Sequence, residues 1–238
     1  RGSGLPTALQ QVSRTESDSQ GRSTLSALED GTTGTILSKH YTVYQTNATL
    51  QFPYWNDSTA QPLLPIQVTA TNNAGMVTDE YAVDPARTAA SGGVPTGLSS
   101  GTSQSHYVRW THNSYDSFTG KLAAVDRYHV IPSSGNGTKD TNYAETAYGY
   151  DSLGRQVRQV TPGGTITRTV FDAIGRTLSS WMGTDDTPTS GTWSPSNTSG
   201  ANMAQIVSYQ YDGGNAGGNS NLTKEIRYVS DDLEANAR

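Results

Sequence analysis

The chain has 238 residues, with 16 Lys and Arg against 21 Asp and Glu, a formal net charge of −5 and no cysteine. The lack of cysteine excludes disulfides, thiolate metal sites and a cysteine nucleophile. The cations are scattered and no run of 18 apolar residues occurs, so we expect no nucleic-acid partner, no anionic-membrane partner and no membrane span.

The composition favours β-structure with a thin or divided core. Hydrophobic residues make up only 33% of the chain, whereas Gly and Pro number 25 and 10 and Ser and Thr are abundant. Turn-forming residues at this density predict many short strands joined by tight turns. We therefore expect an all-β array of antiparallel hairpins, either open or part of a hollow shell or fibre.

Residues 1–35 are predicted to form an N-terminal strand or linker. The chain begins at Arg1 with no apolar signal segment, which is typical of a processed or excised piece. Within this part, Glu16–Asp30 is the one stretch with a weak helical pattern, and QGRST at 20–24 interrupts it.

From residue 36 onward, short alternating segments predict strands. We assign residues 36–104 to a degenerate β-hairpin region and residues 105–238 to a hairpin region with a repeated sequence. The expected strands are ILSKHYTVYQT, PIQVTATN, GMVTDEYAV, HYVRWTHNSY, KLAAVDRYHVI, RQVRQVT, TITRTVF, RTLSSWMG, QIVSYQY and LTKEIRYV. Turn sequences such as TNNAG at 71–75 and DGGNAGGN at 212–219 separate them.

TPGG at 161–164 gives the clearest turn. Pro162 presets φ at the second turn position, and Gly163 is predicted to take the positive φ at the third. RQVRQV and TITRTVF should therefore pair as a hairpin. Neither face of TITRTVF is cleanly apolar, which favours a sheet wetted on both sides or the wall of a hollow shell.

A six-residue unit, aromatic-Asp-x-x-Gly-Arg, occurs as YDSLGR and as FDAIGR, 21 residues apart. We interpret it as a turn between strands, in which the aromatic residue anchors a strand, Asp accepts backbone N–H groups and Gly takes a conformation costly for other residues. Arg should fold back on the Asp four positions earlier. Variants occur at 115–121 and from 211. The repeat-turn residues are Tyr115, Asp116, Gly120, Tyr150, Asp151, Gly154, Arg155, Phe171, Asp172, Gly175, Arg176, Tyr211 and Asp212.

YDSLGRQVRQVTPGGTITRTVFDAIGR resembles the RHS or YD-repeat proteins, named for this Tyr-Asp unit. The resemblance covers residues 107–238. Segments of this region are similar to those found in very large bacterial surface proteins, planctomycete ones in particular. It implies a string of β-hairpins that spirals into a hollow shell in complete toxin-complex and teneurin members. Four units are too few to enclose cargo. VDPART at 83–88 lacks the Gly-Leu of the family's autoprotease segment, so self-cleavage is not carried over.

Candidate chemistry is sparse, and we predict no enzyme, no cofactor and no metal site. His106 and His112 would share one face of a strand but lie about 20 Å apart along it, too far for one metal ion. The pairs Asp185-Asp186 and Asp231-Asp232 are predicted to lie in solvated turns. Calcium at Asp212 in the glycine-rich loop is a weak alternative, because the loop lacks the spacing of calcium-binding repeats.

Two further patterns concern glycans. The first is a set of Asn-x-Ser/Thr sequons, which a secreted chain would use as glycan-attachment sites. The candidate attachment residues are Asn47, Asn56, Asn136, Asn197 and Asn221. The second is a set of aromatic residues that an adhesion module would expose to bind glycans. The tryptophans in question are Trp55, Trp110, Trp181 and Trp193.

The leading hypothesis is a non-enzymatic structural segment of a cell-surface or secreted YD-repeat protein. A sheet this short should leave two open edges, and TITRTVF and QIVSYQY look like edges that seek partners because they carry few charges. We expect β-strand addition from another copy or from the rest of the parent chain, giving an extracellular shell or filament. The alternative is the glycan-binding adhesion module.

Overall fold

The computed structural model describes residues 11–197, 202–215 and 218–228. In this part the regular elements are β-strands and three short 3₁₀ turns, and no α-helix occurs, so the all-β prediction is confirmed. No helix among these residues has the length and apolarity needed to cross a membrane.

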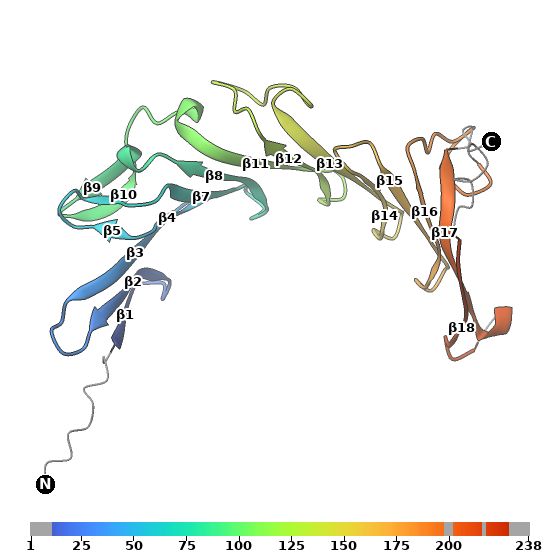
Figure 1. The fold of residues 1–238 in the computed structure, drawn as a ribbon, viewed down its shortest axis with the longest axis horizontal. Helices are drawn as coiled ribbons and strands as arrows, with labels where there is room; N and C mark the ends of the chain where they lie inside the picture. Colours follow the sequence, from blue (N-terminus) through green and yellow to red (C-terminus); the bar gives the residue numbers. More distant parts are fainter. Residues whose placement is uncertain (1–10, 198–201, 216–217, 229–238) are drawn as a thin grey trace, which may run out of the picture. The chain divides into compact units, whose positions relative to one another are not determined.

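The elements follow one another in a simple order (Figure 1). They are β1 (Gln11–Ser17), β2 (Ser23–Asp30), β3 (Ile36–Gln45), β4 (Ala48–Phe52), β5 (Trp55–Asn56), β6 (Gln61–Pro62), β7 (Ile66–Thr71), β8 (Val77–Val83), η1 (Pro85–Arg87), β9 (Thr88–Ser91), β10 (Val94–Leu98), η2 (Gln104–His106), β11 (Tyr107–Tyr115), β12 (Leu122–Tyr128), β13 (Tyr143–Tyr150), β14 (Gln156–Val160), β15 (Ile166–Phe171), β16 (Thr177–Gly183), β17 (Met203–Tyr211), η3 (Asp212–Gly214) and β18 (Leu222–Arg227).

Within the described residues, fourteen strands form one sheet in chain order, from β1 to β18, and the first and last of these strands do not pair with each other. Two small hairpins, β5–β6 and β9–β10, stand outside this order and contact β3. The chain divides into two compact units. Unit 1 comprises residues 1–113 and 126–144, and unit 2 comprises residues 114–125 and 145–238.

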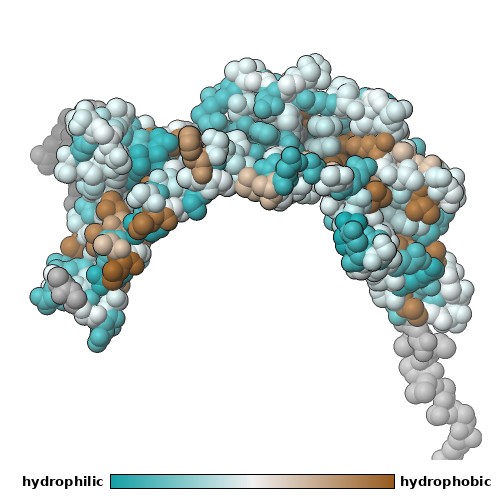
Figure 2. Space-filling view, turned by 180° about the vertical axis from the view of Figure 1, so that it is seen from behind, coloured by the Kyte–Doolittle hydropathy of each residue, from teal (hydrophilic) through white to brown (hydrophobic). Residues whose placement is uncertain are grey.

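The apolar core lies in unit 1. Leu50, Phe52, Ile66 and Val83 are almost fully buried, and the edge of the Trp55 ring packs against Phe52 with the centroids 6.2 Å apart. Trp55 of β5 belongs to this cluster and Leu98 of β10 packs against it, so the two small hairpins add a second layer over β3, β4 and β7. In unit 2 the residues of β13–β18 are mostly half-buried, as expected for strands with two mixed faces. Figure 2 shows apolar residues in small groups on a largely hydrophilic surface.

One local prediction about a turn is wrong. The helical pattern of residues 16–30 forms no helix, and its QGRST interruption overlaps the turn between β1 and β2, where Asp18 N–H is bonded to Arg22 O at 2.9 Å. The hairpin β14–β15 is confirmed, with Arg158 opposite Arg168. However, the positive φ belongs to Gly164 at +80°, not to Gly163. The extra residue makes a type I turn followed by a glycine bulge, a common three-residue hairpin loop.

The edges of the sheet also differ from the prediction. TITRTVF is β15, which pairs with both β14 and β16, and QIVSYQY lies in β17, which pairs with both β16 and β18. Both segments are therefore interior strands. The terminal strands of the described order are β1 and β18, and charged side chains occupy both (Arg14, Glu16, Lys224, Glu225 and Arg227). Charges on an edge restrain promiscuous pairing.

The repeat turns place one glycine each in a left-handed conformation. Gly154 and Gly175 have φ of +77° and +94°, and each donates its N–H to the Asp three positions earlier. An ideal Cβ on Gly175 meets only an Arg155 terminal nitrogen at 3.8 Å, so the constraint there is conformational rather than steric.

We predict that Gly175→Val lowers the free energy of unfolding by about 1–3 kcal/mol, because a β-branched residue is strained at positive φ. The matched control is Ala173→Val, an exposed residue of the same turn whose φ is not positive. Urea denaturation of both variants checks this. Equal stability of the two variants would contradict the turn assignment.

Candidate functional site

Each repeat turn is closed by its aspartate. Asp151 Oδ1 accepts the backbone N–H groups of Leu153 at 3.0 Å and Arg155 at 2.9 Å. Burial raises the pKa of Asp151, but the hydrogen bonds from the Arg155 backbone and side chain outweigh burial, so the pKa lies below its usual value. Asp172 repeats this arrangement with Ile174 and Arg176.

The arginine of each turn connects that turn to the next one. Arg155 Nε donates to Asp151 at 2.6 Å, the i, i+4 contact that the sequence predicts. The same guanidinium lies 4.7 Å from the Phe171 ring centroid, and its Nη1 donates to Asp172 O at 2.9 Å. Each arginine therefore contacts the Asp of its own turn and the aromatic residue and Asp of the following turn.

Arg176 makes the same set of contacts one repeat later. Its Nε donates to Asp172 at 2.6 Å, its guanidinium lies 4.5 Å from the Tyr211 ring centroid and its Nη1 donates to Asp212 Oδ2 at 2.9 Å. In the first repeat, Lys121 replaces Arg and lies 5.5 Å from the Tyr150 ring centroid. We call these three pairs, Lys121–Tyr150, Arg155–Phe171 and Arg176–Tyr211, the turn array.

Sequence reasoning missed a related turn in unit 1. Asp18 and Arg22 belong to an Asp-x-x-Gly-Arg sequence without the leading aromatic residue, and the Arg22 guanidinium lies 4.2 Å from the Tyr44 ring centroid. Tyr44 Oη donates to Ser23 O at 3.1 Å, just as Tyr150 Oη donates to Leu122 O at 3.0 Å. The Asp-x-x-Gly-Arg spacing alone was the signal that could have identified it.

A second cluster in unit 2 involves buried charges. Asp186 is 7% exposed and accepts from Arg158 Nε at 2.7 Å and from Arg168 Nε at 2.5 Å. Burial raises the pKa of Asp186, but the two guanidinium groups lower it more. The prediction of a solvated turn is therefore wrong for Asp186. Asp185 is half-buried, and its carboxylate accepts the Thr187 N–H at 2.9 Å.

In unit 1, His112 and Asp79 form a pair between β11 and β8. His112 Nδ1 lies 2.7 Å from Asp79 Oδ1, which also accepts the Trp110 indole N–H at 2.9 Å. The Asp79 carboxylate raises the pKa of His112 despite partial burial. Burial raises the pKa of Asp79, but hydrogen bonds from His112 and Trp110 lower it more.

Tyr81, Tyr107, Gln104 and Asn136 line a pocket of about 340 Å³ beside this pair. His106 lies in η2 rather than in β11, and its ring contacts Ser103, so the two histidines are not on one strand. Within the described ranges, no three His, Asp or Glu side chains converge as a metal site would require.

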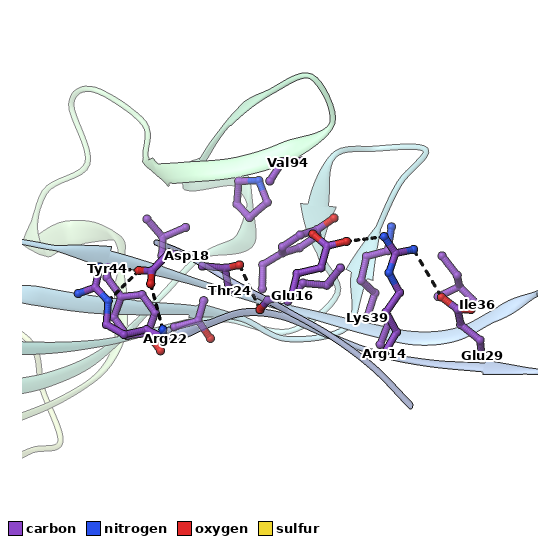
Figure 3. Close-up of a pocket in the computed structure, with 16 residues that line it drawn as sticks. Arg14, Glu16, Asp18, Arg22, Thr24, Glu29, Ile36, Lys39, Tyr44 and Val94 are labelled. Carbon is purple, nitrogen blue, oxygen red and sulfur yellow. Dashed lines mark hydrogen bonds and ion pairs between the residues drawn. The ribbon is translucent and has the colours of Figure 1, made fainter. Parts of the chain in front are cut away.

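A groove of about 560 Å³ lies over β1–β3 and beside β10 (Figure 3). The buried residues Leu25 and Ala27 are part of its lining. Its rim carries ion pairs, including Arg22 with Asp18 at 2.7 Å and Arg14 with Glu29 at 3.8 Å. Opposite charges alternate along the rim, so the groove presents no net charge to a partner.

The tryptophans and sequons are placed as follows. Trp55 and Trp110 are each 6% exposed, so the expectation that they are exposed is wrong, whereas Trp181 and Trp193 are half-buried. Asn47, Asn136 and Asn221 are exposed and Asn56 and Asn197 are half-buried. Asp231-Asp232 lies outside the described residues.

We predict that Arg155→Gln and Phe171→Leu couple energetically. A cation over an aromatic face contributes about 0.5–1 kcal/mol at an exposed site, and residues in contact are not additive. A double-mutant cycle measured by urea denaturation should give a coupling free energy in this range. The control pair, Arg155→Gln with Tyr44→Leu, lies in different units and should be additive. Additivity of both pairs would contradict a role for the contact in stability.

We predict that the stabilisation from the His112–Asp79 pair falls as pH rises. The His112 pKa is raised in the folded chain, so its contribution is fully present below the unfolded value of 6.5 and is lost as pH rises through the folded pKa. The Asp79 contribution is fully present above the unfolded value of 3.8 and is lost as pH falls through the lowered folded pKa, where protonation removes the partner of His112.

The measurement is the unfolding free energy of wild type and His112→Asn from about pH 5 to about pH 9. The difference between them should shrink toward alkaline pH. Asn113→Ala, which changes the same strand without removing a titratable group, serves as control, and its effect on the unfolding free energy should not depend on pH. A difference that is constant with pH would exclude the ion pair.

Comparison with known proteins gives matches only among solved structures. No family model matches the chain, and no curated protein sequence is significantly similar to it. The crystal structure of TcdB2-TccC3-Cdc42 aligns with a TM-score of 0.38 at 16% identity, over 85% of this chain and 9% of that chain.

The structure of the Photorhabdus luminescens Tc holotoxin pore aligns with a TM-score of 0.38 at 14% identity, over 91% of this chain and 10% of that chain. The chain thus spans about a tenth of the length of these Tc toxin components. At such identities and TM-scores, the likeness carries no inference about function.

Proposed function

We propose that this chain is a non-enzymatic structural segment of a cell-surface or secreted YD-repeat protein, whose strands pair with the rest of a longer chain or with another copy to build an extracellular shell or filament. The observation that supports this most strongly is the turn array. Each cation contacts the aromatic residue of the next repeat, so the functional partner of one repeat is another repeat.

The contacts of the turn array are suited to joining successive repeats rather than to catalysis within one repeat. Arg155 and Arg176 use their guanidinium groups to join three backbone or side-chain groups across two turns. Such contacts repeat as often as the turn repeats, and each added hairpin brings its own aromatic residue and aspartate. This is the behaviour of quasi-one-dimensional repeat proteins, in which nearest neighbours stabilise one another.

The ends of the strand order supply the surfaces for pairing. All seven residues of β1 are exposed, and in β18 only Ile226 is half-buried. A terminal strand presents unpaired backbone N–H and C=O groups that another strand can extend. Arg14, Glu16, Lys224 and Glu225 would bias these edges toward a partner with complementary charges.

The alternative, a glycan-binding adhesion module, has less support, because two of the four tryptophans that it would expose are buried. Trp55 belongs to the apolar core, and Trp110 stacks on Tyr128 with the ring centroids 3.9 Å apart. Two of the four tryptophans are thus committed to packing, which leaves Trp181 and Trp193.

We predict that the isolated 238 residues form oligomers or polymers at micromolar concentration, as size-exclusion chromatography with light scattering would show. Val12→Lys, at an exposed position of β1, should shift the distribution toward smaller species because charge on an edge opposes strand addition. Val130→Lys is the matched control, since Val130 is similarly exposed but lies outside the strands. A compact, cooperatively folded monomer in all three samples would overturn the proposal.

A further inference from the structure

Unit 2 contains a pocket of about 270 Å³ that is lined both by residues of the turn array and by residues outside it. It is bordered by β13–β15 and by residues 192–195, which follow β16 in the chain. The side chains that give it chemical character are two arginines, Arg155 and Arg168, and three aromatic residues, Tyr150, Phe171 and Trp193.

Cross-strand register explains why Arg168 reaches this place. Gly149, Arg158, Arg168 and Trp181 are successive partners across β13, β14, β15 and β16, so they form one row on one face of the sheet. Gly149 leaves room for its neighbour, because a Cβ there would approach Arg158 Cβ to 3.0 Å. Arg158 and Arg168 place two positive charges side by side in this row, and the Asp186 carboxylate accepts hydrogen bonds from both.

The geometry leaves hydrogen-bond donors available. Asp186 engages Arg168 through Nε alone, and no acceptor in the described part of the chain contacts the two terminal nitrogens of Arg168. Arg155 likewise uses Nε and Nη1 and keeps Nη2. Arginine is a strong ligand for carboxylates because parallel N–H groups can bind both oxygens.

The local charge favours an anion. Two guanidinium groups and one carboxylate, that of Asp151, line the pocket, and Asp151 is already engaged by Arg155. The lining is therefore positive by one charge in a chain whose formal net charge is −5. A cationic ligand would meet repulsion here, and a neutral one could accept from the guanidinium groups only through weaker hydrogen bonds without charge assistance.

The other walls favour a ring with hydroxyl groups. The Arg168 guanidinium lies over one face of the Trp193 ring, 4.9 Å from its centroid, and Trp193 makes an edge contact with Trp181, so a ligand ring would contact the remaining face or edge of Trp193. Thr192 and Ser194 beside it add hydroxyl groups to the lining. Drug-sized ligands occupy pockets of about 300–1,000 Å³. At about 270 Å³ this pocket lies just below that range, so its size suits a single ring.

We propose that this pocket binds a uronic acid residue of an acidic saccharide, with its carboxylate on Arg168 and its ring against Trp193. The carboxylate supplies the acceptors that the terminal nitrogens of Arg168 lack. The ring hydroxyls match Thr192 and Ser194. The inference concerns binding only, and it stands independently of the proposed structural role, because it requires no strand pairing.

The test is titration of the full chain with D-galacturonate or D-glucuronate, followed by tryptophan fluorescence and by calorimetry. The matched probes are the uronate methyl ester, which keeps the ring and removes the charge, and D-galactose. Uronate should bind about tenfold or more tightly than either probe, since a charge-assisted hydrogen bond is lost with them. Affinity should fall as salt rises. Benzoate binding as tightly as uronate would overturn the saccharide assignment, and no uronate binding up to its solubility limit would overturn the site.

Variants locate the site. Arg168→Gln and Trp193→Ala should each weaken uronate binding about tenfold or more. Arg227→Gln, which removes the same charge from an exposed side chain outside the pocket, should bind as wild type does. Because Arg168→Gln also disturbs Asp186, its melting curve is recorded, and Trp193→Ala provides the test that does not remove a buried charge. Unchanged affinity in Trp193→Ala, or an equal loss in Arg227→Gln, would overturn the assignment.

Discussion

The contact between the cation of one turn and the aromatic residue of the next is the interaction on which unit 2 depends. Its strands are mostly half-buried, and neither face of β15 offers a continuous apolar surface. Backbone hydrogen bonds align neighbouring strands but do not by themselves fix which turn lies beside which. The guanidinium of Arg155 does so, because it must satisfy Asp151 and Asp172 while it covers Phe171.

Unit 1 reaches stability by a different route. There the small hairpins β5–β6 and β9–β10 add a second layer over β3, β4 and β7, and this layer buries Phe52, Ile66 and Val83. A two-layer arrangement removes apolar surface from water, which is the dominant favourable contribution to folding. The chain thus combines a conventional core with an array of polar and aromatic contacts between turns.

The buried charges of unit 2 likewise share a partner, because one carboxylate serves two guanidinium groups. Arg158 and Arg168 are directly opposite one another on adjacent strands, a placement that is unfavourable without compensation. Asp186 lies between them and accepts hydrogen bonds from both. This arrangement leaves the terminal nitrogens of Arg168 beside the Trp193 ring in the pocket of unit 2. The residues that balance the buried charges therefore also form the proposed binding site.

The sequence by itself determined the class of fold and the local turn chemistry. Aromatic-Asp-x-x-Gly-Arg spacing identified the turn of Gly154, and TPGG identified the β14–β15 hairpin, because these preferences depend on a few adjacent backbone dihedrals. It placed the positive φ one residue early and overlooked the Asp18–Arg22 turn, where no aromatic residue precedes the aspartate.

Only the tertiary structure decided which strands lie at the edges, which tryptophans are buried and where Asp186 lies. These properties depend on cross-strand register and on segments distant in the chain. Asp186 meets Arg158 across 28 residues, and Trp110 meets Asp79 across 31. No local pattern encodes such contacts, because a pair of residues on different strands becomes neighbours only when the whole sheet has formed.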